Sequence, residues 1–118
     1  MNALMYAYLG DAIYEFFIRK YLLEKGFNKP KELQRESIKY VSATNQKRLL
    51  ELLINDNFLT SEEIDIVTYG RNSNKTSSKS CDIKTYRYAT GFECLIGKLY
   101  YDNKLKRIEE IMDKVVSY

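Results

Sequence analysis

Histidine is absent from the 118-residue sequence, and cysteine occurs only as Cys81 and Cys94. Without histidine the chain cannot form a Ser-His-Asp triad or a thiolate-imidazole nucleophile, and two cysteines do not make an ordinary four-ligand zinc site. Any acid, base or metal site must therefore use carboxylates, lysines, tyrosines or bound water.

Proline occurs once, and no apolar stretch reaches the roughly 18 residues that a membrane-spanning helix needs. Apolar residues make up 45% of the chain and charged residues 30%, which is typical of globular domains rather than disordered chains. The length predicts a single domain over residues 1–118, without room for a second folded module. Widely spaced cysteines and the lack of a signal peptide predict a soluble, cytoplasmic protein.

Positive charge is concentrated in one short segment. The net charge is +3, yet residues 71–87 hold five basic side chains against one acidic one, while the rest of the chain holds 14 basic and 15 acidic. The five basic residues are Arg71, Lys75, Lys79, Lys84 and Arg87. Frequent serine, asparagine and threonine between them predict a loop over about 71–84. Such a loop can be a solvated linker or an arm that contacts the phosphates of a polyanion, and the sequence leaves both readings open.

Apolar residues recur with helical spacing along nearly the whole chain, and no segment alternates as a strand does, so the pattern predicts an all-α fold. Gly26 is expected to end the first helix, Thr60 and Glu63 have capping-box spacing, and Thr85 and Asn103 are the expected N-caps of the last two helices. The expected helices cover residues 3–24, 30–40, a segment capped by Ser42 or Thr44, 60–69, 85–101 and 103–116.

Two acidic residues occupy unexpected positions in the predicted helices. Asp11 follows Gly10 in the middle of the first predicted helix, where glycine costs about 1 kcal/mol relative to alanine and aspartate is a weak helix former. Glu93 shares a face of the fifth predicted helix with Ala89 and Gly97, which is an apolar side. Each residue also has an ordinary explanation, Asp11 as a solvated carboxylate at a kink and Glu93 as an exposed acid beside the apolar stripe.

Small residues on these two helices would allow a close approach that brings Asp11 and Glu93 together. Adjacent carboxylates in partly dry surroundings resist ionisation unless a cation neutralises them. Oxygen ligands without histidine or thiolate suit Mg²⁺, which can activate water and stabilise charge on a phosphoryl oxygen. Taken jointly, the residues favour a Mg²⁺ site. The small residues are Ala7, Gly10, Gly91 and Gly97.

Two segments around these carboxylates, YLGDAIYE (residues 8–15) and TYRYATGFECLIG (residues 85–97), closely resemble the compact ribonuclease III proteins called Mini-ribonuclease III. The similarity extends to KYVSATNQ (residues 39–46) and YGRN (residues 69–72). The resemblance implies an all-helical, homodimeric ribonuclease III endonuclease domain of about six or seven helices. It also implies Mg²⁺-dependent cleavage of double-stranded RNA that matures the ends of the large-subunit (23S) ribosomal RNA precursor.

The resemblance also implies roles for individual residues. The family's catalytic aspartate matches Asp11 and the glutamate of its second motif matches Glu93, so both are expected to be catalytic and to hold Mg²⁺. Larger members carry a further glutamate and aspartate one turn earlier, where this chain has Ala7 and Thr90. Thr90 and Glu15 are candidates for a supporting role around the metal, and Glu15 is equally a candidate for an ordinary surface acid.

Duplex RNA is recognised mainly through its backbone, 2′-hydroxyls and groove shape, so the five basic residues of 71–87 are expected to position RNA rather than read bases. Compact relatives usually carry a proline before the lysine where this chain has Ser78 before Lys79. Each domain is expected to hold one site, so cutting both strands of a duplex suggests two domains related by a two-fold axis. Phe16 and Phe17 are candidate contacts between the two copies of such a homodimer. A ribosomal protein or pre-ribosomal particle is a further possible partner, and no membrane contact is expected.

Two other functions remain compatible with the sequence. The chain could be a non-catalytic helical module that binds RNA or the ribosome, keeping the fold and the basic segment without competent metal binding. It could also be a small helical protein-interaction domain whose basic segment is only a linker. Cleavage of duplex RNA would indicate the nuclease. Salt-sensitive RNA binding without cleavage would indicate the non-catalytic module, and absence of RNA binding the protein-interaction domain.

Overall fold

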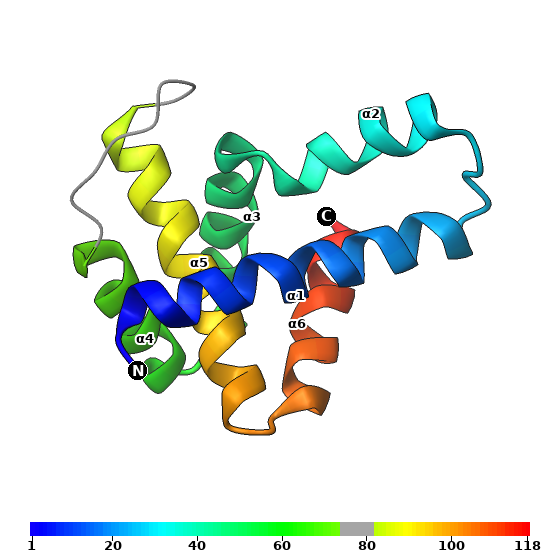
Figure 1. Ribbon diagram of the computed structural model, residues 1–118. Coiled ribbons are helices and arrows are strands. Elements are labelled where there is room, and N and C mark those ends of the chain that lie inside the picture. The colour runs from blue at the N-terminus through cyan, green and yellow to red at the C-terminus, as the bar shows by residue number, and fades with distance from the viewer. Residues whose placement is uncertain (74–81) are drawn as a thin grey trace.

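The computed structural model describes residues 1–73 and 82–118, and all regular structure within these ranges is α-helical (Figure 1). The predicted all-α fold is confirmed. No helix in the described ranges is long and apolar enough to cross a membrane. The helices are α1 (Ala3–Glu24), α2 (Pro30–Val41), α3 (Ala43–Asn55), α4 (Ser61–Ser73), α5 (Ile83–Tyr101) and α6 (Leu105–Ser117).

Local signals explain where the first helices begin and end. The Asn2 side chain accepts a hydrogen bond from the Met5 backbone N–H and so caps α1. Gly26 ends that helix in a left-handed conformation with φ of 99°, as its position in the sequence predicts. Ser42 caps α3 by accepting from the Asn45 N–H, which decides between the two expected caps.

The capping box that starts α4 is also confirmed. The Glu63 N–H donates to Thr60 Oγ1 at 3.1 Å, and the Thr60 N–H donates to Glu63 Oε1 at 2.9 Å. The Glu63 carboxylate also accepts two 2.8 Å bonds from Arg107 of α6, which ties the start of α4 to the last helix.

Two of the predicted caps are wrong. Asp82, not Thr85, caps α5, because its side chain accepts from the Thr85 N–H at 2.7 Å, so the cap lies three residues earlier than expected and the helix begins at Ile83. Asn103 has a φ of 60° and its N–H donates to the Tyr100 carbonyl, so it ends α5 instead of starting α6. Asparagine tolerates the left-handed region, which is why it suits this turn.

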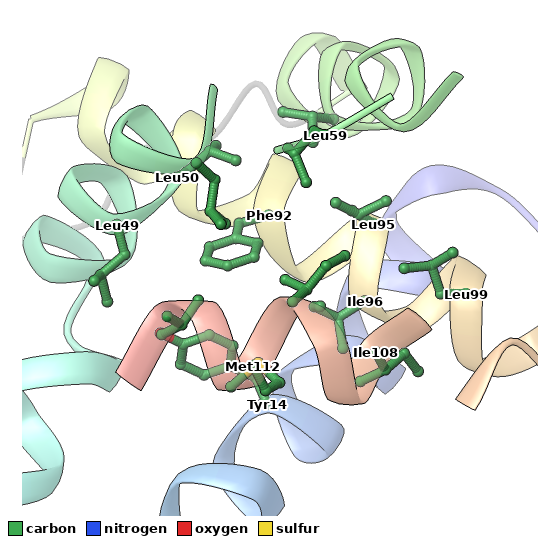
Figure 2. Packing of buried hydrophobic residues seen from close by; sticks show 14 of the residues in the cluster. Tyr14, Leu49, Leu50, Leu59, Phe92, Leu95, Ile96, Leu99, Ile108 and Met112 are labelled. Carbon is green, nitrogen blue, oxygen red and sulfur yellow. The ribbon is translucent and has the colours of Figure 1, made fainter. Parts of the chain in front are cut away.

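Helix α5 lies at the centre of the fold and carries much of the core (Figure 2). The Phe92 ring packs edge-on against Tyr14 of α1 with 5.3 Å between centroids. Tyr14 is fully buried, and its hydroxyl donates to the Tyr40 carbonyl at the end of α2. Other buried core residues come from α3, α5 and α6, namely Leu49, Leu50, Leu53, Leu95, Ile96, Leu99, Ile108, Ile111 and Met112.

Helices α1 and α5 cross with their backbones in contact, more extensively than any other pair of helices in the described ranges. A Cβ atom at Gly10 would overlap the Glu93 carbonyl oxygen, and one at Gly97 would overlap the Tyr6 carbonyl oxygen. The close approach predicted from small residues is therefore confirmed at Gly10 and Gly97, and Ala7 is buried there as well.

Gly91 does not take part in this crossing, contrary to the expectation from the sequence. A Cβ atom at Gly91 would lie 2.6 Å from the carbonyl oxygen of Val67 in α4. Because six residues turn an α-helix by about 600°, which is about 120° short of two full turns, Gly91 and Gly97 face different neighbours. Gly70 of α4 faces the same contact, with Cys94 as its nearest neighbour. Helix α5 thus meets α1 and α4 through separate glycine-lined faces.

Replacing Gly97 with alanine should be unusually destabilising, because the added methyl meets backbone atoms that cannot rotate away. We expect Gly97→Ala to lower the free energy of unfolding by about 3 kcal/mol, measured by chemical denaturation. Gly26→Ala is the control: it has free space around it and should cost about 1 kcal/mol for its left-handed backbone alone. Equal costs for the two variants would contradict the backbone contact.

Candidate active site

The crossing of α1 and α5 brings Asp11 and Glu93 together. Asp11 follows Gly10, whose α-carbon packs on the Glu93 backbone, so the two acidic residues leave the crossing side by side. Their carboxyl groups are close enough for Asp11 to raise the pKa of Glu93, which burial raises most. Asp11 is exposed to solvent and Glu93 is partly buried. The pair therefore has one open side, on which a substrate could approach.

The surroundings of Glu93 disfavour its ionised form. Burial, the hydrogen bond with Asp11 and the charge of Asp11 together raise the pKa of Glu93 to about 9. The charge of Glu15 acts in the same direction, while a hydrogen bond from Gln46 lowers the pKa. At neutral pH and without a cation, Glu93 therefore keeps its proton. A cation held between the two carboxyl groups would oppose this shift, because an opposite charge nearby favours the ionised carboxylate.

Gln46 belongs to this site, although sequence reasoning did not select it. It lies on α3 with only 3% of its surface exposed, and its side-chain amide is close enough to the Glu93 carboxyl to lower the pKa of that group. The available signal was its spacing, since Gln46 shares a face of α3 with the buried Leu49, Leu50 and Leu53. A polar residue on such a face needs a buried partner. That partner comes from α5 and could not be identified from α3 alone.

The two proposed supporting residues differ in their surroundings. Glu15 lies one turn after Asp11, is partly exposed, and forms an ion pair with Arg19 at 3.2 Å. Its charge also raises the pKa of Glu93. Glu15 therefore has features of both expected roles, as a surface acid paired with Arg19 and as a group that acts on the carboxylate pair. Thr90 is buried one turn before Glu93, and its hydroxyl donates to the Tyr86 carbonyl at 3.0 Å.

The oxygen donors at this site fit a hard divalent cation. Within residues 1–73 and 82–118, no group of three or more histidine, cysteine, aspartate or glutamate residues is placed to hold a metal. Asp11 and Glu93 would supply two carboxylates to such a cation, and water or substrate would fill its other coordination positions. Mg²⁺ commonly binds in this way. Zn²⁺ in a structural site, by contrast, requires four protein ligands.

The basic residues lie at the two helix ends that flank residues 74–81. Arg71 is in the last turn of α4, because this helix runs to Ser73 and not to about residue 69. Lys84 and Arg87 are in the first turns of α5. The predicted loop over 71–84 is thus wrong at both ends, because helical turns extend into it. Lys75 and Lys79 lie outside the described residues.

A family model described as the ribonuclease III domain matches residues 4–104. This chain belongs to the ribonuclease III domain family. The resemblance noted from the sequence motifs is thereby confirmed, and the matched residues include Asp11, Gln46 and Glu93. The all-helical fold agrees with this membership.

Similarity to individual relatives extends over most of the chain. It is 42% identical to "Mini-ribonuclease 3" of Streptococcus pneumoniae, over 95% of this chain and 88% of the relative. It is 43% identical to "Mini-ribonuclease 3" of Enterococcus faecalis, over 96% and 86%. A protein of Fusobacterium nucleatum with a known crystal structure is similar with a TM-score of 0.87 and 38% identity, over 99% of this chain and 94% of that one.

The raised pKa of Glu93 predicts that the free energy of unfolding of the metal-free protein depends on pH. The unfolded chain loses this proton near pH 4.5 and the folded chain near pH 9, so between these values the folded state binds more protons. The free energy of unfolding therefore falls as pH rises through this window, by about 1 kcal/mol per pH unit. Glu93→Gln removes the ionisable group. We expect its stability advantage over wild type to grow from about pH 5 to pH 8.

Thermal unfolding in EDTA at several pH values measures this difference. Glu109→Gln, on the exposed face of α6, is the matched control and should show no such growth. A constant difference between Glu93→Gln and wild type over this range would show that Glu93 ionises normally.

Proposed function

We propose that this chain is a Mg²⁺-dependent endoribonuclease that hydrolyses the phosphodiester bonds of double-stranded RNA. The observation that carries the proposal is the direct pairing of Asp11 and Glu93 in a ribonuclease III domain. The proposed catalytic unit is a single domain over residues 1–118. Asp11 and Glu93 are the proposed catalytic and metal-binding residues.

The side chains around the pair have separate tasks in this proposal. Asp11 and Glu93 would hold Mg²⁺, and Asp11, being exposed, faces the side from which RNA approaches. When bound, the ion would lower the pKa of a water molecule and stabilise the charge that develops on a phosphoryl oxygen. Gln46, which favours the ionised form of Glu93, would help to hold that carboxylate toward the cation. Glu15 and Thr90 are proposed to support the pair from one turn away on α1 and α5.

Backbone contacts would position the RNA beside the carboxylates. Arg71, Lys84 and Arg87 lie at neighbouring ends of α4 and α5 and are the proposed RNA-binding residues within the described ranges. Lys75 and Lys79 are proposed from the sequence alone. Because these contacts are to phosphates, we expect weak sequence preference and strong dependence of binding on salt.

A homodimer would place two sites against the two strands of one duplex. Helix α1 supports this, because it exposes large apolar side chains that its own fold leaves uncovered. Tyr8 is 86% exposed, Phe16 59% and Leu23 59%. Phe17, the other candidate from the sequence, is partly buried and packs against the core instead. An apolar surface of this kind on a soluble chain favours association.

The proposed substrate is the large-subunit (23S) ribosomal RNA precursor, processed in the cytoplasm. This rests on similarity to the relatives named "Mini-ribonuclease 3". A ribosomal protein or a pre-ribosomal particle is a proposed additional partner. The alternative function is that of a non-catalytic helical module that binds RNA or the ribosome.

Asp11→Asn tests the proposal, because it keeps the size of the side chain and removes the charge. We expect the rate of Mg²⁺-dependent cleavage of a labelled RNA duplex to fall about 100-fold or more, with thermal stability preserved. Asp113→Asn, on the exposed surface of α6, should cleave at the wild-type rate. Duplex binding by wild type without any cleavage would instead favour a non-catalytic module.

A further inference from the structure

Three cations from three helices surround the ring of Tyr88 on α5. The distances to its centroid are 5.7 Å from Lys47 Nζ of α3, 5.4 Å from Arg71 Cζ of α4, and 5.9 Å from Lys84 Nζ of α5. Because each lies within 6 Å of one point, no two of them are more than about 12 Å apart. The sequence places these residues up to 41 positions from Tyr88 and gave no signal that Lys47 joins the basic segment.

The positive charge at this cluster is only partly neutralised by the described residues. Lys47 forms an ion pair with Glu51 at 3.2 Å. In the described ranges, Arg71 and Lys84 have no ion pair, and Arg71 instead donates to the Tyr88 hydroxyl at 3.4 Å. The hydrogen bonds from Thr85 lower the pKa of Asp82 most, and Lys47 lowers it further, but the Asp82 carboxylate is already engaged as the cap of α5. The cluster therefore keeps a net positive charge that an anion would balance.

The surface beside Tyr88 is hollowed. A pocket of about 300 Å³ lies there, and among the described residues its lining contains no acidic side chain. Its lining residues are Arg71, Asn72, Ile83, Lys84, Arg87 and Tyr88. The pocket thus combines cations, an amide and a hydroxyl, which are groups that hydrogen-bond to phosphate oxygens.

We propose that Lys47, Arg71, Lys84 and Tyr88 form a binding site for one backbone phosphate of duplex RNA. This inference rests on the proposed function and adds Lys47 and Tyr88 to the RNA-contacting residues. The phosphate would sit against the cations, away from the carboxylate pair. Tyr88 is a positioning residue, because its ring lies near all three cations and carries no charge itself.

The same two helices connect this site to the carboxylates. Lys47 directly follows Gln46 on α3, and Tyr88 precedes Glu93 on α5 by five residues, a rise of about 7.5 Å along the helix. Five residues also turn the helix by about 140°, so Tyr88 and Glu93 face different directions. The cluster therefore anchors the RNA backbone at a second point, and a fixed distance along α5 separates that point from the carboxylate pair.

The test measures binding of a 20-base-pair RNA duplex to the full chain in EDTA at several salt concentrations. Removing one phosphate contact should reduce the slope of log affinity against log salt by about 0.9, and affinity at 0.1 M salt roughly tenfold. We expect this of Lys47→Met and Lys84→Met, which keep most of the aliphatic stem. Lys106→Met, on the exposed surface of α6, is the matched control and should leave affinity and slope unchanged.

Two more variants separate a specific cluster from general charge. Glu51→Gln releases Lys47 from its ion pair and should strengthen duplex binding. Tyr88→Leu removes the ring but no charge and should weaken binding severalfold, whereas Tyr88→Phe keeps the ring and should bind nearly as wild type. Equal binding by Tyr88→Leu and Tyr88→Phe would overturn the positioning role of Tyr88.

The outcomes distinguish this inference from the proposed function. If wild type binds and cleaves duplex RNA while Lys47→Met and Lys84→Met match Lys106→Met, the phosphate site is wrong and the nuclease proposal stands. If wild type neither binds nor cleaves duplex RNA, the proposed function fails first. Reduced salt slopes in both lysine variants with intact folding support the phosphate site.

Discussion

The backbone contact between α1 and α5 is the constraint on which the rest of the structure depends. Gly10 and Gly97 leave no space for a side chain, so the two helices meet at one register and angle. Asp11 and Glu93 lie beside this contact and meet because of it. Glycine inside a helix weakens it by about 1 kcal/mol. Here the two glycines allow Asp11 and Glu93 to come together, which bulkier residues at these positions would prevent.

The same crossing places acidic groups where they repel each other. Burial and the neighbouring Asp11 raise the pKa of Glu93, while Gln46 offers only partial compensation. A fold selected for stability alone would have little reason to keep this arrangement, and departures of this kind are expected at functional sites. A divalent cation would turn the repulsion into attraction. The pair and the positive cluster around Tyr88 would then have complementary tasks, the pair binding the cation and the cluster binding phosphate.

Much of this fold could be predicted from the sequence, because helical periodicity and the Thr60–Glu63 capping box are local signals. Asp82 was missed as a cap since several polar residues nearby could serve equally well. Contacts between distant segments were harder. Asp11 and Glu93 could be paired because Asp11 is a weak helix former at mid-helix, Glu93 is an acid on an apolar face, and both lie among small residues. Lys47 violates nothing on its own helix, so only the packing of α3 against α5 reveals its place near Tyr88.

The central claim is that Asp11 and Glu93 together hold one divalent cation, and the most direct measurement is anomalous diffraction from crystals grown with Mn²⁺. This account predicts one strong peak about 2 Å from an oxygen of each carboxylate. The peak should disappear in Glu93→Gln crystals. Mn²⁺ bound elsewhere, or held by one carboxylate while the other turns away, would contradict the claim.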